Sequence, residues 1–358
     1  EIIKGKVSPS FWSGKKVFLT GHTGFKGSWL SLWLQNMGAV LKGYSLEINT
    51  NPALFKLANI DSDMESELGD IRNLEKLTQS MVSFNPDIII HMAAQPLVRH
   101  SYEEPVETFN TNIMGTVNVL ESARKCQDLK TIICITTDKC YENNETDRGY
   151  KEDDSMGGYD PYSSSKGCAE LAISAYRRSF FSNQDSPSLA SARAGNVIGG
   201  GDWADDRLIP DILRAFEKSE NALIRNPLAI RPWQHVLEPL SGYLVLAQEL
   251  FLNGDEFAEA WNFGPTDEDC KSVSWILDRM VDYWGNDVSW SIDDKSNPHE
   301  AGILKLDCSK ASQRLQWRPK WNLEKTLHSI VNWHRVFVDN GDLRKESLNQ
   351  IHEYIKDE

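Results

Sequence analysis

The first half of the chain alternates short apolar runs with longer segments of helical spacing. The apolar runs predict strands at 16–20, 40–44, 87–91, 131–135 and 188–193. Apolar residues three or four positions apart predict helices at 28–37, 112–125 and 162–180. This alternation predicts an α/β fold, a Rossmann-type doubly wound parallel sheet with helices on both faces.

The pattern becomes irregular and rich in tryptophan after residue 196. Nine of the twelve tryptophans follow this point, where the glycine run at 199–201 is typical of a loop. We therefore expect a Rossmann domain at 1–195, rejoined by a segment at about 233–263. Residues 196–358 are expected to form a smaller, mixed α/β domain that binds the substrate. The charged stretch after residue 340 predicts a surface helix.

Composition narrows the class of protein. A chain of 358 residues with 40% hydrophobic and 25% charged residues is ordinary for a globular enzyme, and its net charge of −14 argues against nucleic-acid binding. No apolar run is long enough for a membrane span, and residues 1–16 lack the apolar core of a secretory signal. The six cysteines form no C-x-x-C pair, which predicts free thiols in a reducing cytoplasm and no metal site.

Polar and glycine residues follow the predicted strands. Right-handed crossovers bring the carboxyl ends of parallel strands to one edge of the sheet. Gly21 and the segments 91–95, 136–141 and 193–196 therefore converge on one crevice.

A glycine motif, G-x-x-G-x-x-G, lies directly between the first strand and the first helix. Its glycines permit a tight turn, a close approach of backbone to phosphate, and close packing of helix on sheet, while the helix N-terminus favours an anion. The alternative is a glycine-rich turn without a ligand. The motif predicts a dinucleotide diphosphate site formed by Gly21, His22, Thr23, Gly24, Phe25, Lys26 and Gly27.

Two carboxylates are candidates for the adenosine part of that ligand. Glu47 stands about 20 residues after the loop, where an acidic residue often binds the ribose, and is equally consistent with a solvated loop carboxylate. Asp70 is a candidate for the adenine amino group, although a lone aspartate is usually a turn residue. No arginine follows the second strand, which favours NAD over NADP.

Tyr162 and Lys166 form a Y-x-x-x-K pair on a predicted helix. A spacing of four puts both side chains on one face, where the ammonium group favours the phenolate that removes a hydroxyl proton. The pair is common by chance on helix surfaces. Its place after the glycine loop favours the catalytic interpretation.

Thr137, Asp138 and Lys139 follow a buried strand at the crevice edge. The threonine is placed to hydrogen-bond a substrate hydroxyl, the aspartate to act as a general acid, and the lysine to act as a base or an electrostatic anchor. The alternative is a plain surface ion pair.

These motifs together resemble the extended short-chain dehydrogenase/reductase family, over about residues 15–321. The resemblance rests on the glycine loop, Asp70-Ile71, 91–94, Asn112, 162–166 and 193–196. Within this family the chain is most similar to the nucleotide-sugar 4,6-dehydratases. The segments 21–29, 137–141 and 299–301 resemble the branch that acts on CDP-glucose.

The resemblance implies an NAD-dependent reaction without net redox change, which yields a 4-keto-6-deoxy sugar of the kind used in lipopolysaccharide O-antigens. Tyr162 would take the proton of the C4 hydroxyl with Thr137 assisting, and Lys166 would bind the nicotinamide ribose. Asp138 would protonate the leaving C6 hydroxyl. Related enzymes have a glutamate at the position of Lys139, so this lysine either removes the C5 proton or contacts the cofactor. His22 is a second departure, which either alters cofactor affinity or is solvated.

The resemblance also implies binding residues and an assembly. Those for the cofactor are the seven loop residues with Asp70, Ile71, Ala93, Ala94, Asn112, Tyr162 and Lys166. Those for the nucleotide sugar are Gln95, Thr137, Asn196, Arg207, Arg231 and His299. Family members commonly dimerise through two helices, here 112–125 and 162–180, which implies a homodimer or higher homo-oligomer.

Two other functions remain open. One is another nucleotide-sugar enzyme of the family, either a 4-epimerase or a dehydratase for a different nucleotide. The other is a non-catalytic NAD-binding scaffold, because a fold does not determine a function.

Overall fold

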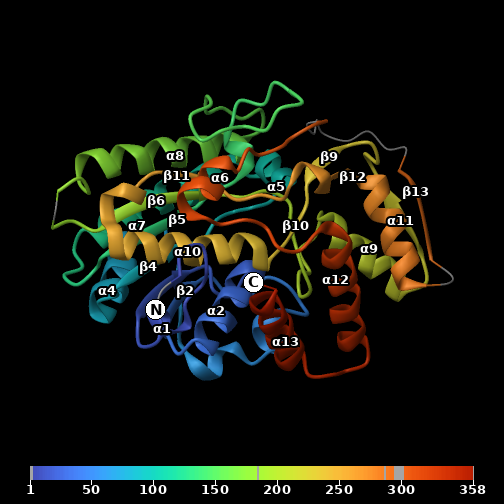
Figure 1. Ribbon diagram of the computed structural model, residues 1–358, viewed down its shortest axis with the longest axis horizontal. Coiled ribbons are helices and arrows are strands. Elements are labelled where there is room, and N and C mark those ends of the chain that lie inside the picture. Colours follow the sequence, from blue (N-terminus) through green and yellow to red (C-terminus); the bar gives the residue numbers. More distant parts are fainter. Residues whose placement is uncertain (1–2, 184, 286–287, 294–301, 358) are drawn as a thin grey trace.

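A seven-stranded sheet forms the centre of the molecule. The computed structural model describes residues 3–183, 185–285, 288–293 and 302–357 (Figure 1). The strand order is β11-β6-β5-β4-β1-β2-β3, with parallel pairing throughout. The strands are β1 (Lys16–Thr20), β2 (Val40–Ser45), β3 (Glu65–Leu68), β4 (Ile88–His91), β5 (Thr131–Ile135), β6 (Ser188–Arg193) and β11 (Ala260–Asn262). The predicted doubly wound sheet is confirmed, and its strand order reverses between β1 and β4, where such sheets bind ligands.

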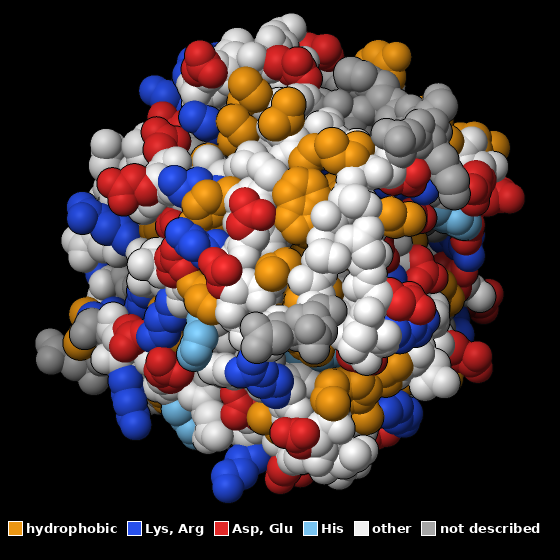
Figure 2. Space-filling model, turned by 90° about the vertical axis from the view of Figure 1, so that its right-hand side faces the viewer, with side chains coloured by type: hydrophobic (Ala, Val, Ile, Leu, Met, Phe, Trp, Pro, Cys, Tyr) orange, Lys and Arg blue, Asp and Glu red, His pale blue; other side chains and the backbone are white. Residues whose placement is uncertain are grey.

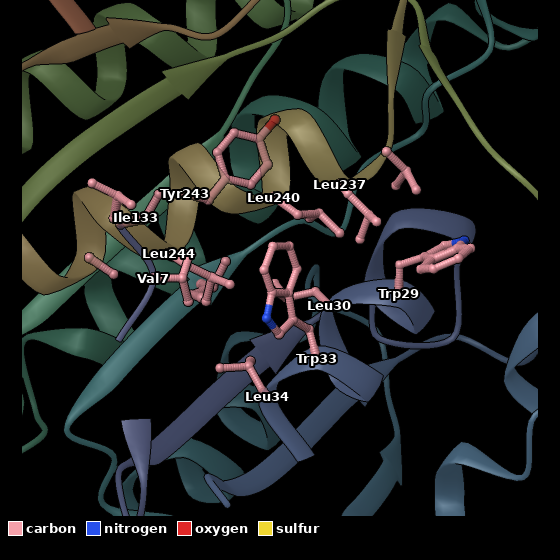
Figure 3. Close-up of a cluster of buried hydrophobic side chains, with 14 of the residues drawn as sticks. Val7, Trp29, Leu30, Trp33, Leu34, Ile133, Leu237, Leu240, Tyr243 and Leu244 are labelled. Carbon is pink, nitrogen blue, oxygen red and sulfur yellow. The ribbon is translucent and has the colours of Figure 1, made fainter. Parts of the chain in front are cut away.

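The central strands place alternate side chains in two layers of helices. On β1, Val17 and Leu19 join one core and Phe18 joins the opposite core. The first layer contains α2 (Phe25–Asn36) and α10 (Leu237–Asn253), and the second contains α4 (Leu74–Phe84), α7 (Gly115–Ala123) and α8 (Pro161–Ser179). Figure 3 shows Leu30 and Trp33 of α2 beside Leu240 of α10, so the helix of the glycine loop is fixed by apolar packing.

A second, smaller core lies beside the sheet, to the right in Figure 1. It is built from α9 (Leu208–Glu217), α11 (Val273–Trp284) and α12 (Leu323–Val338), with the parallel pair β8 (Asn221–Ile224) and β13 (Ser289–Ile292). The chain returns from this unit to the large sheet through α10 and β11. Two separate cores are present, but the first also contains residues near the end of the chain, among them Trp317, Trp333 and Tyr354, so the division near residue 195 stays a proposal.

Shorter elements connect the two units and frame their junction. Two further strand pairs join β7 (Val197–Ile198) to β10 (Gln234–His235) and β9 (Ile230–Pro232) to β12 (Cys270–Ser272). The short helices are α1 (Pro9–Trp12), α3 (Leu54–Leu57), α5 (Val98–Glu103) and α6 (Pro105–Phe109).

The last helix, α13 (Leu343–Lys356), differs from the predicted surface helix. Leu343, Ile351 and Tyr354 are buried, and the Tyr354 ring meets Trp33 of α2 edge to face at 5.8 Å. A narrow apolar stripe is hidden there among charged residues, and it covers the outer side of α2.

The surface is charged and mixed in sign on the face that Figure 2 shows. Lysine and arginine side chains lie among aspartate and glutamate side chains, and hydrophobic side chains gather near the centre of this face. Across the described part of the chain, no helix combines the length and apolar character needed to cross a membrane.

Candidate active site

A cavity of about 510 Å³ lies between the carboxyl edge of the sheet and the second unit. The glycine loop, the turn after β5 and the start of α8 contribute Phe25, Lys26, Asp138 and Tyr162 to its wall. The second unit contributes residues of the loop before α9 and of β9. The crevice predicted from the strand ends is therefore present.

The glycine loop is pressed against its neighbours at two points. Gly21 has φ +76°, and a Cβ added there would lie 2.8 Å from the backbone nitrogen of Ala93. A Cβ on Gly27 would lie 2.1 Å from the carbonyl oxygen of Gly21. Gly24 caps α2 without a side chain, which leaves the first backbone N–H groups of the helix to an outside acceptor. These features fit the diphosphate of a dinucleotide.

The imidazole of His22 is fully buried, so the solvated alternative is wrong. Its Nε2 is 2.7 Å from Ser66 Oγ, and its ring meets Phe55 edge to face. The ring also fills the space that a side chain on Gly43 would need. Burial lowers the pKa of His22 to about 4. This histidine therefore packs the loop against β2 and β3 and is not part of the cavity wall.

The proposed adenosine contacts carry partners of their own. Arg72 Nη2 donates to Asp70 Oδ2 at 2.6 Å, and its backbone N–H donates to Asp70 Oδ1 at 2.8 Å. This guanidinium group holds the pKa of Asp70 below its usual range. Ile71 is buried against Gly115. Glu47 is exposed beyond β2.

Asn112 and Gln95 brace the loop that follows β4. The Asn112 amide donates to the Gln95 carbonyl at 3.0 Å and to Ser165 Oγ at 2.9 Å. Its oxygen accepts from the Gln95 backbone N–H at 2.9 Å. The Gln95 side chain bonds Thr108 and Leu97, and Gln95 is not in the cavity wall. These bonds hold Ala93 and Ala94 beside the glycine loop.

Tyr162 and Lys166 lie on the inner face of α8, which begins at the Asp160 cap. Burial raises the pKa of Tyr162 to about 12, against a hydrogen bond with Thr137, so the expectation that Lys166 favours the phenolate is wrong. Lys166 Nζ donates to the carbonyl of Ile135 across 3.5 Å, and burial lowers its pKa to about 8. Both side chains are less than a tenth exposed, so the surface alternative is wrong.

The turn after β5 is a short 3₁₀ helix, Asp138–Cys140. Thr137 Oγ1 donates to Asp138 Oδ1 at 2.9 Å and accepts from the Lys139 backbone N–H. Asp138 is 1% exposed, and burial raises the pKa of its carboxyl group. Lys139 Nζ lies 6.0 Å from the centroid of the Tyr162 ring. Because Asp138 is buried, the alternative of a surface ion pair is wrong.

Lys26 extends from the glycine loop into the cavity. The sequence analysis had named it only as one of the seven loop residues around the diphosphate. Its ammonium group has no hydrogen-bond or ion-pair partner in the described parts of the chain. Burial lowers the pKa of Lys26 to about 7, and the nearby charges of Lys166 and Arg207 lower it further, whereas Asp138 opposes them. The cavity therefore carries positive charge that suits a phosphorylated ligand.

Three of the residues expected to bind the nucleotide sugar line the cavity from beyond β6. Asn196, Arg207 and Arg231 all line the cavity, and Arg207 Nη1 donates to Asp202 Oδ2 at 2.9 Å. Arg231 Nη1 donates to the carbonyls of Ile230 and Gly302 at 2.9 and 3.1 Å. His299 lies outside the described residues.

The sequence analysis missed several residues of the cavity wall. They are Arg99, Asp202, Arg225 and Trp233. Both of those arginines pair with Asp206, at 3.1 and 3.6 Å. The signal that might have revealed the loop before α9 is the run of carboxylates that precedes Arg207.

A family model described as GDP-mannose 4,6 dehydratase matches residues 18–330. The chain is 57% identical over 353 residues to a CDP-glucose 4,6-dehydratase of Salmonella typhimurium, covering 98% of each chain. It is 25% identical over 344 residues to a CDP-paratose 2-epimerase of Salmonella typhi, covering 89% of this chain and 98% of the relative.

Solved structures show the same fold. A dTDP-glucose 4,6-dehydratase of Bacillus anthracis in complex with NAD superposes with a TM-score of 0.75 at 20% identity, covering 92% of this chain and all of that chain. An epimerase of Methanothermobacter thermautotrophicus reaches 0.79 at 21% identity, covering 95% and 96%.

The fold and the Y-x-x-x-K site define a short-chain dehydrogenase/reductase of the extended, nucleotide-sugar type. The chain belongs to the GDP-mannose 4,6 dehydratase family, which confirms the predicted resemblance.

Proposed function

We propose that the protein is an NAD-dependent CDP-glucose 4,6-dehydratase that releases CDP-4-keto-6-deoxyglucose and water. The observation that carries this proposal is the buried Asp138 carboxyl group beside Tyr162 in one cavity. A dehydratase needs an acid for the leaving hydroxyl in addition to a base for the oxidised one, whereas an epimerase needs no such acid. The 57% identical relative is named for this reaction.

The glycine loop, Ala93, Ala94, Lys26 and Lys166 are the residues that would hold NAD. The tight contacts of Gly21 and Gly27 leave the loop backbone free of side chains at the α2 N-terminus. When bound, NAD would supply the hydride acceptor for C4 and the hydride donor for C6, so the oxidation and the reduction would cancel. Asp70, Ile71 and Asn112 shape the surrounding loops through their own contacts.

Tyr162 is the base for the C4 hydroxyl proton, and its hydrogen bond with Thr137 orients the phenol. Asp138 donates a proton to the C6 hydroxyl as the C6–O bond breaks, and the raised pKa of this carboxyl group keeps the proton available. Lys139 lines the cavity near Tyr162 and is our candidate for the base that removes the C5 proton. The C5 proton would be returned to C5 when hydride is delivered to C6, and the proton that Tyr162 takes from the C4 hydroxyl would balance the proton that Asp138 gives to the released water.

Arg207, Arg231 and Asn196 are the proposed contacts of the substrate diphosphate. They line the same cavity as Tyr162, from the second unit and from the loop after β6. Guanidinium groups suit this role because they bind phosphate oxygens with two parallel N–H groups.

The test is incubation of the purified protein and NAD with the glucose esters of CDP, dTDP, UDP and GDP. The near-ultraviolet band of a 4-keto sugar in alkali measures the product. We expect product from CDP-glucose in clear excess over the other three. Faster turnover of another ester would reassign the nucleotide, C4 inversion without the band would favour an epimerase, and no reaction with any ester would favour a scaffold.

We also propose a homodimer that forms through α7 and α8. Leu171 of α8 is 60% exposed and Met114, just before α7, is 48% exposed, which suits an apolar interface. Sedimentation of the wild type and of Leu171→Glu tests this, because the dimer should dissociate in the variant.

The six free cysteines favour a reducing cytoplasmic location, which fractionation of cells would test.

A further inference from the structure

Three side chains on α8 engage three consecutive residues at the end of β5. Tyr162 hydrogen-bonds Thr137, and Lys166 donates to the carbonyl of Ile135. Glu170 Oε1 accepts a hydrogen bond from Thr136 Oγ1. The spacing of four places the three side chains in one row along the helix.

Glu170 is the residue of this row that has no role in the proposed reaction. It is 4% exposed and does not line the cavity. Its Oε2 accepts from Arg193 Nη2 and from Ser191 Oγ, each at 2.8 Å, so it ties α8 to β6 as well as to β5. Arg193 also donates to the Tyr141 hydroxyl at 2.7 Å, just beyond the catalytic turn. The Glu170–Arg193 pair thus joins the elements that carry the proposed acid and base.

A buried ion pair of this kind is poor evidence for stability, because apolar residues of equal volume often stabilise a protein as well or better. Its position directly behind the catalytic turn offers another reason for its presence.

Several titratable groups face Lys166 from the elements packed around it. They are Lys26, His91, Cys134, Cys140, Tyr162 and Glu170. Burial raises the pKa of both thiols and lowers that of His91 to about 3, so these three groups are neutral. Among these groups Glu170 is the one whose negative charge attracts the Lys166 ammonium group.

We propose that Glu170 is a positioning residue, which with Arg193 holds the end of β5 so that Thr137 meets Tyr162, and whose carboxylate places a negative charge one helical turn from Lys166. This inference rests on the proposed function, in which Tyr162 and Lys166 are catalytic.

The test compares Glu170→Gln with the wild type in the pH dependence of kcat for CDP-glucose. Without the carboxylate, the ammonium form of Lys166 is less favoured and loses its proton at lower pH. We expect the alkaline limb to move down by about one pH unit, kcat to fall about tenfold or more, and KM to change less than about threefold. Lys26 titrates in both proteins, so its titration appears in both pH profiles and does not account for a difference between them.

Two further variants separate charge from structure. Glu170→Asp keeps the charge, so its alkaline limb should stay at the wild-type pH even if kcat falls. Glu238→Gln removes another buried glutamate, which bonds Trp321 and Tyr354 away from the cavity, and should leave the limb in place. An unmoved limb in folded Glu170→Gln, or an equal movement in Glu238→Gln, overturns the proposal.

Glu170→Gln leaves Arg193 buried without its carboxylate and is at risk of not folding. The double variant E170Q/R193Q removes both charges, and Arg193 is not among the groups that shift the pKa of Lys166. We expect the same shift of the limb. If the wild type turns over no nucleotide sugar, the proposed function fails, and the pH dependence of NAD affinity, followed by tryptophan fluorescence, tests the inference by the same comparison.

Discussion

The Asp138 carboxyl group packs directly against Gly195 in the cavity wall. A Cβ added to Gly195 would lie 1.8 Å from Asp138 Oδ2. This oxygen has no hydrogen-bond partner among the described residues, while Oδ1 accepts from Thr137. The carboxyl group is therefore oriented on one side and desolvated on the other, as a proton donor for a leaving hydroxyl should be.

Asp138→Asn should abolish dehydration while oxidation at C4 persists. The amide keeps the hydrogen bond of Thr137 in reach but carries no acidic proton, so product formation should fall by about 100-fold or more. The measurement is product formation beside absorbance of the reduced cofactor in a single turnover. Unchanged product formation would remove Asp138 from the mechanism.

The same substitution should stabilise the protein near neutral pH. Burial raises the pKa of Asp138 in the folded state, so the folded protein binds this proton more tightly than the unfolded chain does. Stability from this group is therefore lost as pH rises through the normal carboxyl range, and the charged form is a cost at pH 7. Removal of an ionisable group from a buried site is worth about 1–3 kcal/mol, or a few degrees in Tm. A Tm at or below that of the wild type at pH 7, measured by calorimetry, would contradict this account.

Tyr162→Phe should lower kcat by about 100- to 10,000-fold and leave NAD affinity nearly unchanged, because only the transferred proton loses its acceptor. The raised pKa of the phenol also means that wild-type kcat/KM should increase with pH from acid to neutral. Steady-state kinetics and a fluorescence titration with NAD measure the two effects. Tyr176→Phe is a matched control on the same helix, since its hydroxyl donates to Glu121 instead. Equal losses in both variants would indicate a structural effect.

Binding of NAD should take up a proton at pH 8 through Lys26. Its pKa of about 7 leaves the free amine mostly neutral at this pH, and a bound diphosphate favours the ammonium form. Calorimetric titrations in buffers of different ionisation enthalpy measure the uptake. Lys26→Met should lose the uptake and bind NAD more weakly, whereas Lys325→Met, a substitution of a lysine paired with Asp357, should keep both. Proton uptake that persists in Lys26→Met would assign it to another group.

His22→Ala should reduce the free energy of unfolding by about 2–4 kcal/mol, because it leaves a cavity between the glycine loop and β2. Chemical denaturation measures this, and His352→Ala, at an exposed position on α13, is the control. The hypothesis that His22 tunes NAD affinity stays a prediction. With the ring outside the cavity wall, such an effect would have to act through the position of the loop.

The strands that the sequence located best are those buried on both faces. Predicted and observed bounds agree for β5 and β6, where the side chains are buried along the whole strand. β3 was missed because its residues, Glu65–Leu68, pair with β2 alone and are largely exposed, so no apolar pattern marks them. The apolar stripe of α13 was also missed, because charged residues stand between its members.

Residues of the candidate site were also predicted well where a local motif identifies them and poorly where tertiary contacts decide their role. Spacing alone located the glycine loop and the pair Tyr162 and Lys166, because a fixed motif determines which way those groups face. Gln95 and Asn112 have amide groups suited to a ligand, yet tertiary hydrogen bonds that no local pattern encodes consume them. Glu170 stands four residues after Lys166, a spacing that would have placed it on the catalytic face.

The packing of α13 on α2 joins two segments that lie about 300 residues apart in the chain, which has a consequence for the order of folding. Trp33 lies beside Tyr354, and Asn36 accepts a hydrogen bond from His352 at 3.3 Å. During synthesis, the helix that follows the glycine loop emerges from the ribosome more than 300 residues before these partners do. The sheet can assemble in the meantime, but the outer side of this helix stays uncovered until α13 has been synthesised. Maturation of the cofactor site is therefore expected to follow the synthesis of α13.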